Sequence, residues 1–351
     1  MKRALALALL LSCSAPPTPW QWVLPPGFPT PSVPADNPMS VEKVELGRLL
    51  FNDVALSRNQ TQSCASCHQA DKAFSDGRAN AVGSTGENHR RNAMALLNPA
   101  YFTTYTWANP LMSSLEKQAL VPLFGETPVE LGWSGHEAEL LARLSTSVDY
   151  RQGFQRAFAE ERDPVSLSTL TKALAAYERS ILQGHSAYDA FRSGDTQALS
   201  ASAQRGLTLF FSERLECTHC HGGFNFADAV AHDGTVNREM PFHNTGLYND
   251  DGVGAYPKRD QGLIEITLQP QDMGRFRAPS LRNVALTAPY MHDGSVATLS
   301  DAIDHYAVGG RASRTTGTRS PLQSEFVRGF TLTPDEKADL LAFLESLTER
   351  P

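Results

Sequence analysis

Two short motifs of the same form, one in each half of the chain, constrain what this sequence can fold into. Residues 64–68 read Cys-Ala-Ser-Cys-His and residues 217–221 read Cys-Thr-His-Cys-His. In the form Cys-x-x-Cys-His, the two thiols attach to the vinyl groups of a c-type haem and the histidine is a proximal iron ligand. The sequence therefore predicts two covalently bound haems c, held by Cys64, Cys67, His68, Cys217, Cys220 and His221.

The main alternative is a zinc site built from all four motif cysteines. The two cysteine pairs of such a site are usually separated by about 15–20 residues. Here the whole segment 68–216 lies between them, and a zinc site would leave the motif histidines unexplained. Haem attachment accounts for both histidines.

The N-terminus predicts export. A basic start is followed by an apolar run, residues 4–11, that is too short to span a bilayer and is typical of a signal peptide. The run leads into Cys13 through a sequence that resembles a bacterial lipobox, although an incidental cysteine after an ordinary signal is the alternative. We expect residues 1–12 to be a signal peptide, Cys13 to carry a lipid, and the proline-rich segment 13–38 to be a stiff tether. The protein would then lie on the periplasmic side of a bacterial membrane.

A weak internal repeat precedes the motifs. Gly47 and Phe51 stand four residues apart before the first motif, as Gly206 and Phe210 do before the second. Residues at this spacing share one face of a helix. We therefore expect a closely packed helix before each motif, and one motif in each of two domains.

Helical signals dominate the remaining sequence. Apolar spacing predicts a helix over residues 165–181. Thr333, Pro334 and Glu336 fit the N-cap, first position and capping box of a last helix. We expect an all-α fold with two cytochrome-c-like helical domains and long loops: an N-terminal haem domain at residues 39–197 and a C-terminal haem domain at residues 198–351.

The distal side of each haem decides what the haem does. Two strong axial ligands suit electron transfer, whereas an open position can bind peroxide. The residue pattern does not by itself identify a ligand distant in sequence. The candidates in the second half are Met240, Met273, Met291, His292, His305 and Tyr306.

Longer motifs carry a family resemblance over residues 40–347. The segment 276–294, Phe-Arg-Ala-Pro-Ser-Leu-Arg-Asn-Val through Ala-Pro-Tyr-Met-His-Asp-Gly, resembles the signature of bacterial dihaem cytochrome c peroxidases and MauG proteins. Segments 123–132, 221–226, 242–248 and 272–276 look like the MbnH branch. The resemblance implies an enzyme that uses hydrogen peroxide, with a copper-binding, MbnP-like partner protein whose tryptophan is oxidised to kynurenine.

The resemblance also implies a distal ligand for the second haem. The peroxidases place a methionine a short way after the Ala-Pro-Tyr-x-His motif, and the MauG group places a tyrosine there. Here Tyr306 stands at that position. A phenolate ligand should stabilise higher iron oxidation states, whereas a thioether raises the haem potential. This favours storage of oxidising equivalents over reception of electrons.

The first haem is expected to be open on its distal side and to be the peroxide-reactive one. Resting peroxidases block this side with a histidine. By the family spacing the blocking position here is Ser84, while His89 lies near enough to remain a candidate ligand.

The same resemblance implies the residues that act on peroxide. Gln118 and Pro122 match a family helix over the iron, and Glu130 matches the catalytic carboxylate. Two extra residues before Glu130 leave Glu126 as an alternative. A general acid/base carboxylate would move a proton between the two peroxide oxygens.

Two further positions follow from the resemblance. Trp107 falls near the family tryptophan that carries electrons between the haems. A structural calcium ion is expected between the domains, with Asn92, Arg277 and Pro279 at the matching ligand positions.

Three functions remain open at this stage, and the third is not enzymatic. The leading hypothesis is a MauG/MbnH-like oxidase, the second is a cytochrome c peroxidase supplied by a small redox protein, and the third is a dihaem electron carrier. The formal charge of −7 argues against nucleic-acid binding.

Overall fold

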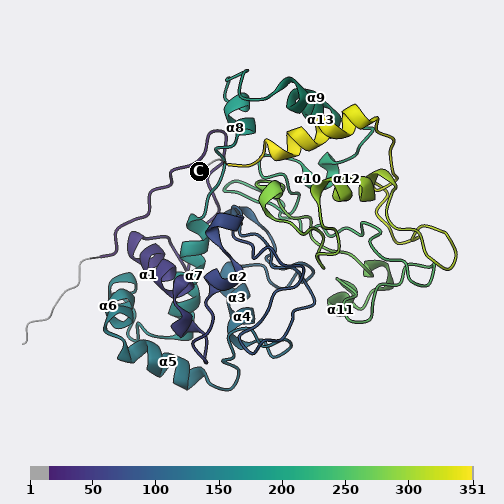
Figure 1. Ribbon diagram of the computed structural model, residues 1–351. Helices are drawn as coiled ribbons and strands as arrows, with labels where there is room; N and C mark the ends of the chain where they lie inside the picture. The colour runs from purple at the N-terminus through teal and green to yellow at the C-terminus, as the bar shows by residue number, and fades with distance from the viewer. Residues whose placement is uncertain (1–15, 350–351) are drawn as a thin grey trace, which may run out of the picture.

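The computed structural model describes residues 16–349, which form two helical lobes (Figure 1). Within this range the β-structure consists of isolated bridges, so the predicted all-α class is confirmed. None of the described helices is long and apolar enough to cross a membrane. The helices are α1 Val41–Asn52, α2 Cys64–Cys67, α3 Leu115–Gln118, α4 Leu120–Phe124, α5 Glu137–Thr146, α6 Val148–Ala157, α7 Leu167–Ser180, α8 Ala187–Arg192, α9 Ala201–Phe210, α10 Thr218–His221, α11 Ile264–Thr267, α12 Leu299–Ala307 and α13 Pro334–Glu345.

The N-terminal lobe is built on α1 and α7, which pack against each other (Figure 1). Ser40 caps α1 by accepting a hydrogen bond from the Lys43 N–H. Gly47 lies at the crossing, where a Cβ would meet the Ala173 carbonyl oxygen at 2.0 Å. The helix predicted over 165–181 is confirmed as α7. Its apolar residues share one core with Leu50, Trp133 and Phe154.

The C-terminal lobe repeats this arrangement with α9 and α13, which lie side by side (Figure 1). A Cβ at Gly206 would meet the Asp339 carbonyl oxygen at 1.9 Å. Thr333 and Glu336 form the predicted capping box of α13, with Pro334 at its first position. The short helix preceding each motif is thus anchored through a glycine to a longer helix far along the chain.

The chain passes from the first core to the second before the expected boundary at residue 198. The first core ends in sequence with residues of α7, and the second begins with Tyr188 on α8. Tyr188 packs edge-on against Phe226 and Phe343. The short helix α8 therefore belongs to the C-terminal core, although it lies within the segment 39–197 assigned to the first domain.

The proline-rich segment lies against the body instead of standing away from it. Val41 N–H donates to the Thr18 carbonyl oxygen, and the ring of Phe28 packs against Tyr101 and Phe224. As its prolines imply, residues 16–38 contain no helix. Phe28 is buried by these contacts with both lobes, whereas Val23 is exposed. Composition alone could not predict which side chain of the segment makes such contacts. The predicted signal peptide and Cys13 lie outside the described residues.

Candidate haem sites

The first motif lines a cavity in the N-terminal lobe of about 1450 Å³, its open mouth included. α2 is one helical turn, so Cys64 and Cys67 face the same side. His68 Nδ1 donates a hydrogen bond to the Phe74 carbonyl oxygen, 2.9 Å away. This contact leaves Nε2 as the free ring nitrogen, and burial lowers the pKa of His68 so that the ring is neutral. A neutral imidazole tied through its other nitrogen is the usual state of a metal ligand.

Gln118, Pro122 and Glu130 line the same cavity. Gln118 ends α3 and Pro122 lies in α4, so two short consecutive helices place them. Glu130 follows in the next loop, with 34% of its side chain accessible. Burial raises the pKa of Glu130 to about 7. The structure therefore places an amide, a proline and a carboxyl that can change protonation near neutral pH around one space.

The structure separates the alternatives for these positions. Glu126 lies on the surface, where its carboxylate accepts a hydrogen bond from the Ser134 hydroxyl at 2.6 Å. His89 lines the cavity, with Nδ1 3.8 Å from Glu130 Oε1. Ser84 donates its backbone N–H to the Glu130 carbonyl oxygen, 2.9 Å away, and its side chain is not part of the cavity wall.

The second motif lines a cavity of about 1600 Å³ in the C-terminal lobe, again with its mouth included. Cys217, Cys220 and His221 all contribute to its wall. His221 Nδ1 lies 3.1 Å from the Pro279 carbonyl oxygen and 3.3 Å from that of Phe226. Burial lowers the pKa of His221 too. The two proximal histidines therefore share one arrangement.

Tyr306 also lines the second cavity, and burial raises the pKa of its phenol. It lies on α12 next to His305, whose Nε2 donates to the Thr245 carbonyl oxygen at 2.9 Å and which does not line the cavity. Met291 and His292 line it as well, but the His292 ring stacks on Phe276 at 3.6 Å. Met240 and Met273 are not part of the wall.

Six residues line both cavities, and they form the partition between them: Asn92, Ala93, Met94, Ala95, Trp107 and Arg277. The Trp107 indole N–H donates to the Asn92 carbonyl oxygen at 2.9 Å. The Asn92 side-chain amide donates to the carbonyl oxygens of Arg78 and Pro289. Among the positions expected to bind calcium, the Pro279 carbonyl faces the nitrogen of His221.

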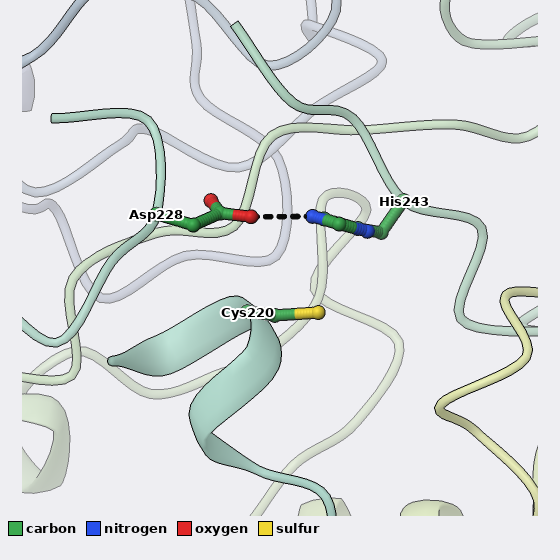
Figure 2. A group of neighbouring side chains, drawn as sticks. All are labelled: Cys220, Asp228 and His243. Atoms are coloured by element: carbon green, nitrogen blue, oxygen red, sulfur yellow. Dashed lines mark hydrogen bonds and ion pairs between the residues drawn. The ribbon is translucent and has the colours of Figure 1, made fainter. Parts of the chain in front are cut away.

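A carboxylate–imidazole pair lies beside the second attachment point (Figure 2). His243 Nε2 is 2.5 Å from Asp228 Oδ2, and the Cys220 sulfur lies next to both. Burial alone would lower the pKa of His243, but the hydrogen bond to Asp228 raises it. Because Cys220 belongs to the attachment motif, we interpret the pair as a neighbour of the haem and not as a separate metal site.

Sequence reasoning missed Glu178, which lines the first cavity and is 6% exposed. Burial raises its pKa to about 8. A signal for it exists, since Glu178 follows Leu170 and Leu174 at four-residue spacing on the apolar face of α7. A carboxylate on such a face indicates a special environment.

The comparisons with known proteins agree with this geometry. The model of the di-haem cytochrome c peroxidase family matches residues 41–197. MauG of Methylophilus methylotrophus is 33% identical over 337 residues, covering 94% of this chain and 91% of that protein. The cytochrome-c peroxidase IdrP1 of Pseudomonas sp. strain SCT is 34% identical over 340 residues, covering 92% of this chain and 86% of that protein. The chain belongs to the di-haem cytochrome c peroxidase and MauG family.

A solved structure agrees over nearly the whole chain. The crystal structure of a MauG-like protein associated with microbial copper homeostasis superposes with a TM-score of 0.90 at 49% identity. The alignment covers 94% of this chain and 96% of that one. The resemblance drawn from the sequence is thereby confirmed.

Family membership gives the cofactor and the enzyme class. The protein is a haem-dependent, peroxide-using oxidoreductase with two haems c. The residues present fit that cofactor, because each cavity has two free, half-buried thiols and a neutral histidine on its wall.

Proposed function

We propose that this protein is a MauG-like oxidase of the MbnH type, which uses hydrogen peroxide to oxidise a tryptophan of a partner protein to kynurenine. The observation that carries the proposal is Tyr306, a half-buried tyrosine on the wall of the second cavity. It occupies the position where the peroxidases carry methionine. The 49% identity to a MauG-like protein associated with copper homeostasis supports a copper-binding, MbnP-like partner.

In this proposal four cysteines hold the haems and three side chains ligate iron. Cys64 and Cys67 would attach the first haem, with His68 as its iron ligand. The second motif would hold the second haem in the same way, with His221 and Tyr306 as its iron ligands. The cofactor supplies reversible storage of two oxidising equivalents taken from peroxide. We assign the peroxide-reactive haem to residues 39–197 and the second haem to residues 198–351.

Glu130 and Gln118 act on peroxide in the first cavity. A carboxylate at Glu130 would take a proton from one peroxide oxygen and return it to the other. The pKa of about 7 supports this task, because proton acceptance and donation are then both accessible near neutral pH. Gln118 orients the peroxide through its amide, and Pro122 fills the wall beside it.

Trp107 connects the two sites. Its ring lines both cavities, and its N–H is held by the Asn92 carbonyl oxygen. A fixed aromatic ring between two redox centres supports electron transfer from one to the other. Trp107 would be the ring through which electrons from the partner pass from the second cavity to the first.

The partner reaction balances with peroxide as the oxidant. Two peroxides accept four electrons, the tryptophan gains two oxygen atoms to give N-formylkynurenine, and two waters remain. Hydrolysis then releases formate and leaves kynurenine. Because the electrons travel through the protein, the tryptophan need not enter either cavity.

Location and calcium complete the proposal. A cleaved signal before Cys13, with a lipid on that cysteine, would hold the protein on the periplasmic side of a bacterial membrane. A structural calcium ion bound by the Asn92 side chain and the carbonyls of Arg277 and Pro279 would brace the partition. Loss of thermal stability on removal of calcium with a chelator tests the calcium site, and mass spectrometry of the N-terminal peptide tests the lipid.

The experiment that tests the function adds peroxide to the diferric protein mixed with the copper-binding partner. We expect mass spectrometry to find two oxygens, or kynurenine, at one partner tryptophan. Tyr306→Met should abolish this product. The matched control is Tyr290→Phe, because Tyr290 lines the same cavity but donates its hydroxyl to the Val284 carbonyl oxygen. Equal partner oxidation by the Tyr306→Met variant would contradict the proposal.

A second candidate function is peroxide reduction with electrons from a small redox protein. The observation in its favour is the 34% identity to a cytochrome-c peroxidase. Steady-state turnover of peroxide with a small cytochrome or cupredoxin, far faster than any oxidation of a partner tryptophan, would favour this alternative.

A further inference from the structure

The guanidinium of Arg277 lies in the partition between the two cavities and lines both. The residue is 4% exposed, so the charge is fully inside the protein. The backbone of Arg277 is fixed by a hydrogen bond, in which its N–H donates to the Trp107 carbonyl oxygen at 2.8 Å. Its position is therefore fixed by the same partition that carries Trp107.

The contacts of this guanidinium are neutral and weak. Nε is 3.4 Å from the Thr106 carbonyl oxygen, and Nη2 is 3.3 Å from the Met94 sulfur. The guanidinium carbon lies 4.1 Å from the centre of the Phe102 ring. Nη1 is buried and has no hydrogen-bond partner among residues 16–349. An arginine has five N–H donors, and these contacts leave most of its capacity unused.

No described acidic side chain pairs with this charge. Asp228 is the carboxylate whose charge raises the pKa of Arg277. Its side chain is hydrogen-bonded to His243 and makes no ion pair with the guanidinium. Burial lowers the pKa of Arg277 to about 10. Arg282, by contrast, is equally buried and makes two bonds to Asp189. An arginine without an acid in such a position calls for an anion from outside the chain.

We propose that Arg277 is a shared anchor for the carboxylate side chains of both haems. The cofactor carries propionates, arginine binds carboxylates through parallel N–H donors, and this guanidinium faces both spaces that the family cofactor fills. A single cation close to both haems stabilises the reduced state of each iron, since reduction removes positive charge. Arg277 would thus raise both midpoint potentials, in addition to any calcium contact of its main chain.

The test measures the midpoint potential of each haem by optical redox titration of the purified dihaem protein. Arg277→Gln should lower both potentials, and Arg277→Lys, which keeps the charge, should lower them less. The control is Arg275→Gln, because Arg275 lies two residues away, is accessible and lines neither cavity. Its potentials should match those of the unmodified protein.

Each other outcome overturns the proposal. If the midpoint potential of only one haem shifts, Arg277 binds the propionates of that haem alone and is not shared. If neither shifts beyond the Arg275→Gln control, the guanidinium only packs on Phe102. If Arg277→Gln does not yield dihaem protein, resonance Raman spectra of Arg277→Lys replace the titration. The proposal then requires the propionate bands of both haems to differ from those of the unmodified protein. These readouts do not involve a partner protein, so they remain independent of the proposed tryptophan oxidation.

Discussion

Replacement of Glu130 by glutamine tests whether the carboxylate transfers a proton or only fills space in the first cavity. The amide keeps the size of the carboxyl but cannot accept the peroxide proton. General acid–base groups contribute about 10²–10⁴-fold to rate, so we expect the rate constant for the reaction of peroxide with the diferric protein to fall by this amount. Glu126→Gln is the matched control, because Glu126 lies on the surface four residues earlier and does not line the cavity.

The pH profile follows from the raised pKa. The carboxylate is the form that accepts a proton, so activity is present above the folded pKa and lost as pH falls through it. With a pKa of about 7, Glu130 is about nine-tenths ionised at pH 8 and about one-tenth ionised at pH 6. The rate constant should therefore fall about tenfold across that range. His89 faces Glu130, and burial lowers the pKa of His89 below its ordinary value.

Stopped-flow absorption at the Soret band, from pH 5.5 to 8.5, provides the measurement. The unmodified protein and Glu126→Gln should show the same inflection near pH 7, and Glu130→Gln should show a low, flat rate. A lower rate constant in Glu126→Gln, or an inflection near pH 7 that persists in Glu130→Gln, would refute the role of Glu130.

Two further predictions concern the frame that holds the sites. Phe28→Ala should lower the free energy of unfolding by about 3–5 kcal/mol, because the ring is buried against Tyr101; Val23→Ala, at an 87% exposed position of the same segment, should change it by less than about 0.5 kcal/mol. Equal urea midpoints for these two variants would show that the segment does not brace the lobes. Gly206→Ala should cost about 1–3 kcal/mol, since its Cβ would meet the Asp339 carbonyl oxygen at 1.9 Å. An unchanged thermal midpoint of the Gly206→Ala variant would contradict this close packing.

Local signals in the sequence predicted much of this frame. The attachment motifs, the capping box at Thr333 and the repeated glycines depend on neighbours within a few residues. Gly47 and Gly206 were expected to permit close packing, and both lie where a helix meets a carbonyl oxygen of another. The capping box and the glycine spacing follow from helix geometry, and the attachment motifs follow from the chemistry of haem binding.

Contacts between residues far apart along the chain could not be predicted from the sequence. Tyr188 joins the second core through Phe343, far along the chain, so the expected boundary fell after α8. Phe28 packs on rings from both lobes, which a proline-rich composition does not reveal. The unpaired state of Arg277 likewise depends on which acids the fold brings near it.

Resonance Raman and electron paramagnetic resonance spectra of the ferric protein test the central claim most directly, because that claim depends on Tyr306 as a ligand of the second haem. We expect iron–phenolate bands in the unmodified protein and in Tyr290→Phe, and their loss in Tyr306→Met. Methionine ligation in the unmodified protein, or phenolate bands that persist in Tyr306→Met, would contradict the account.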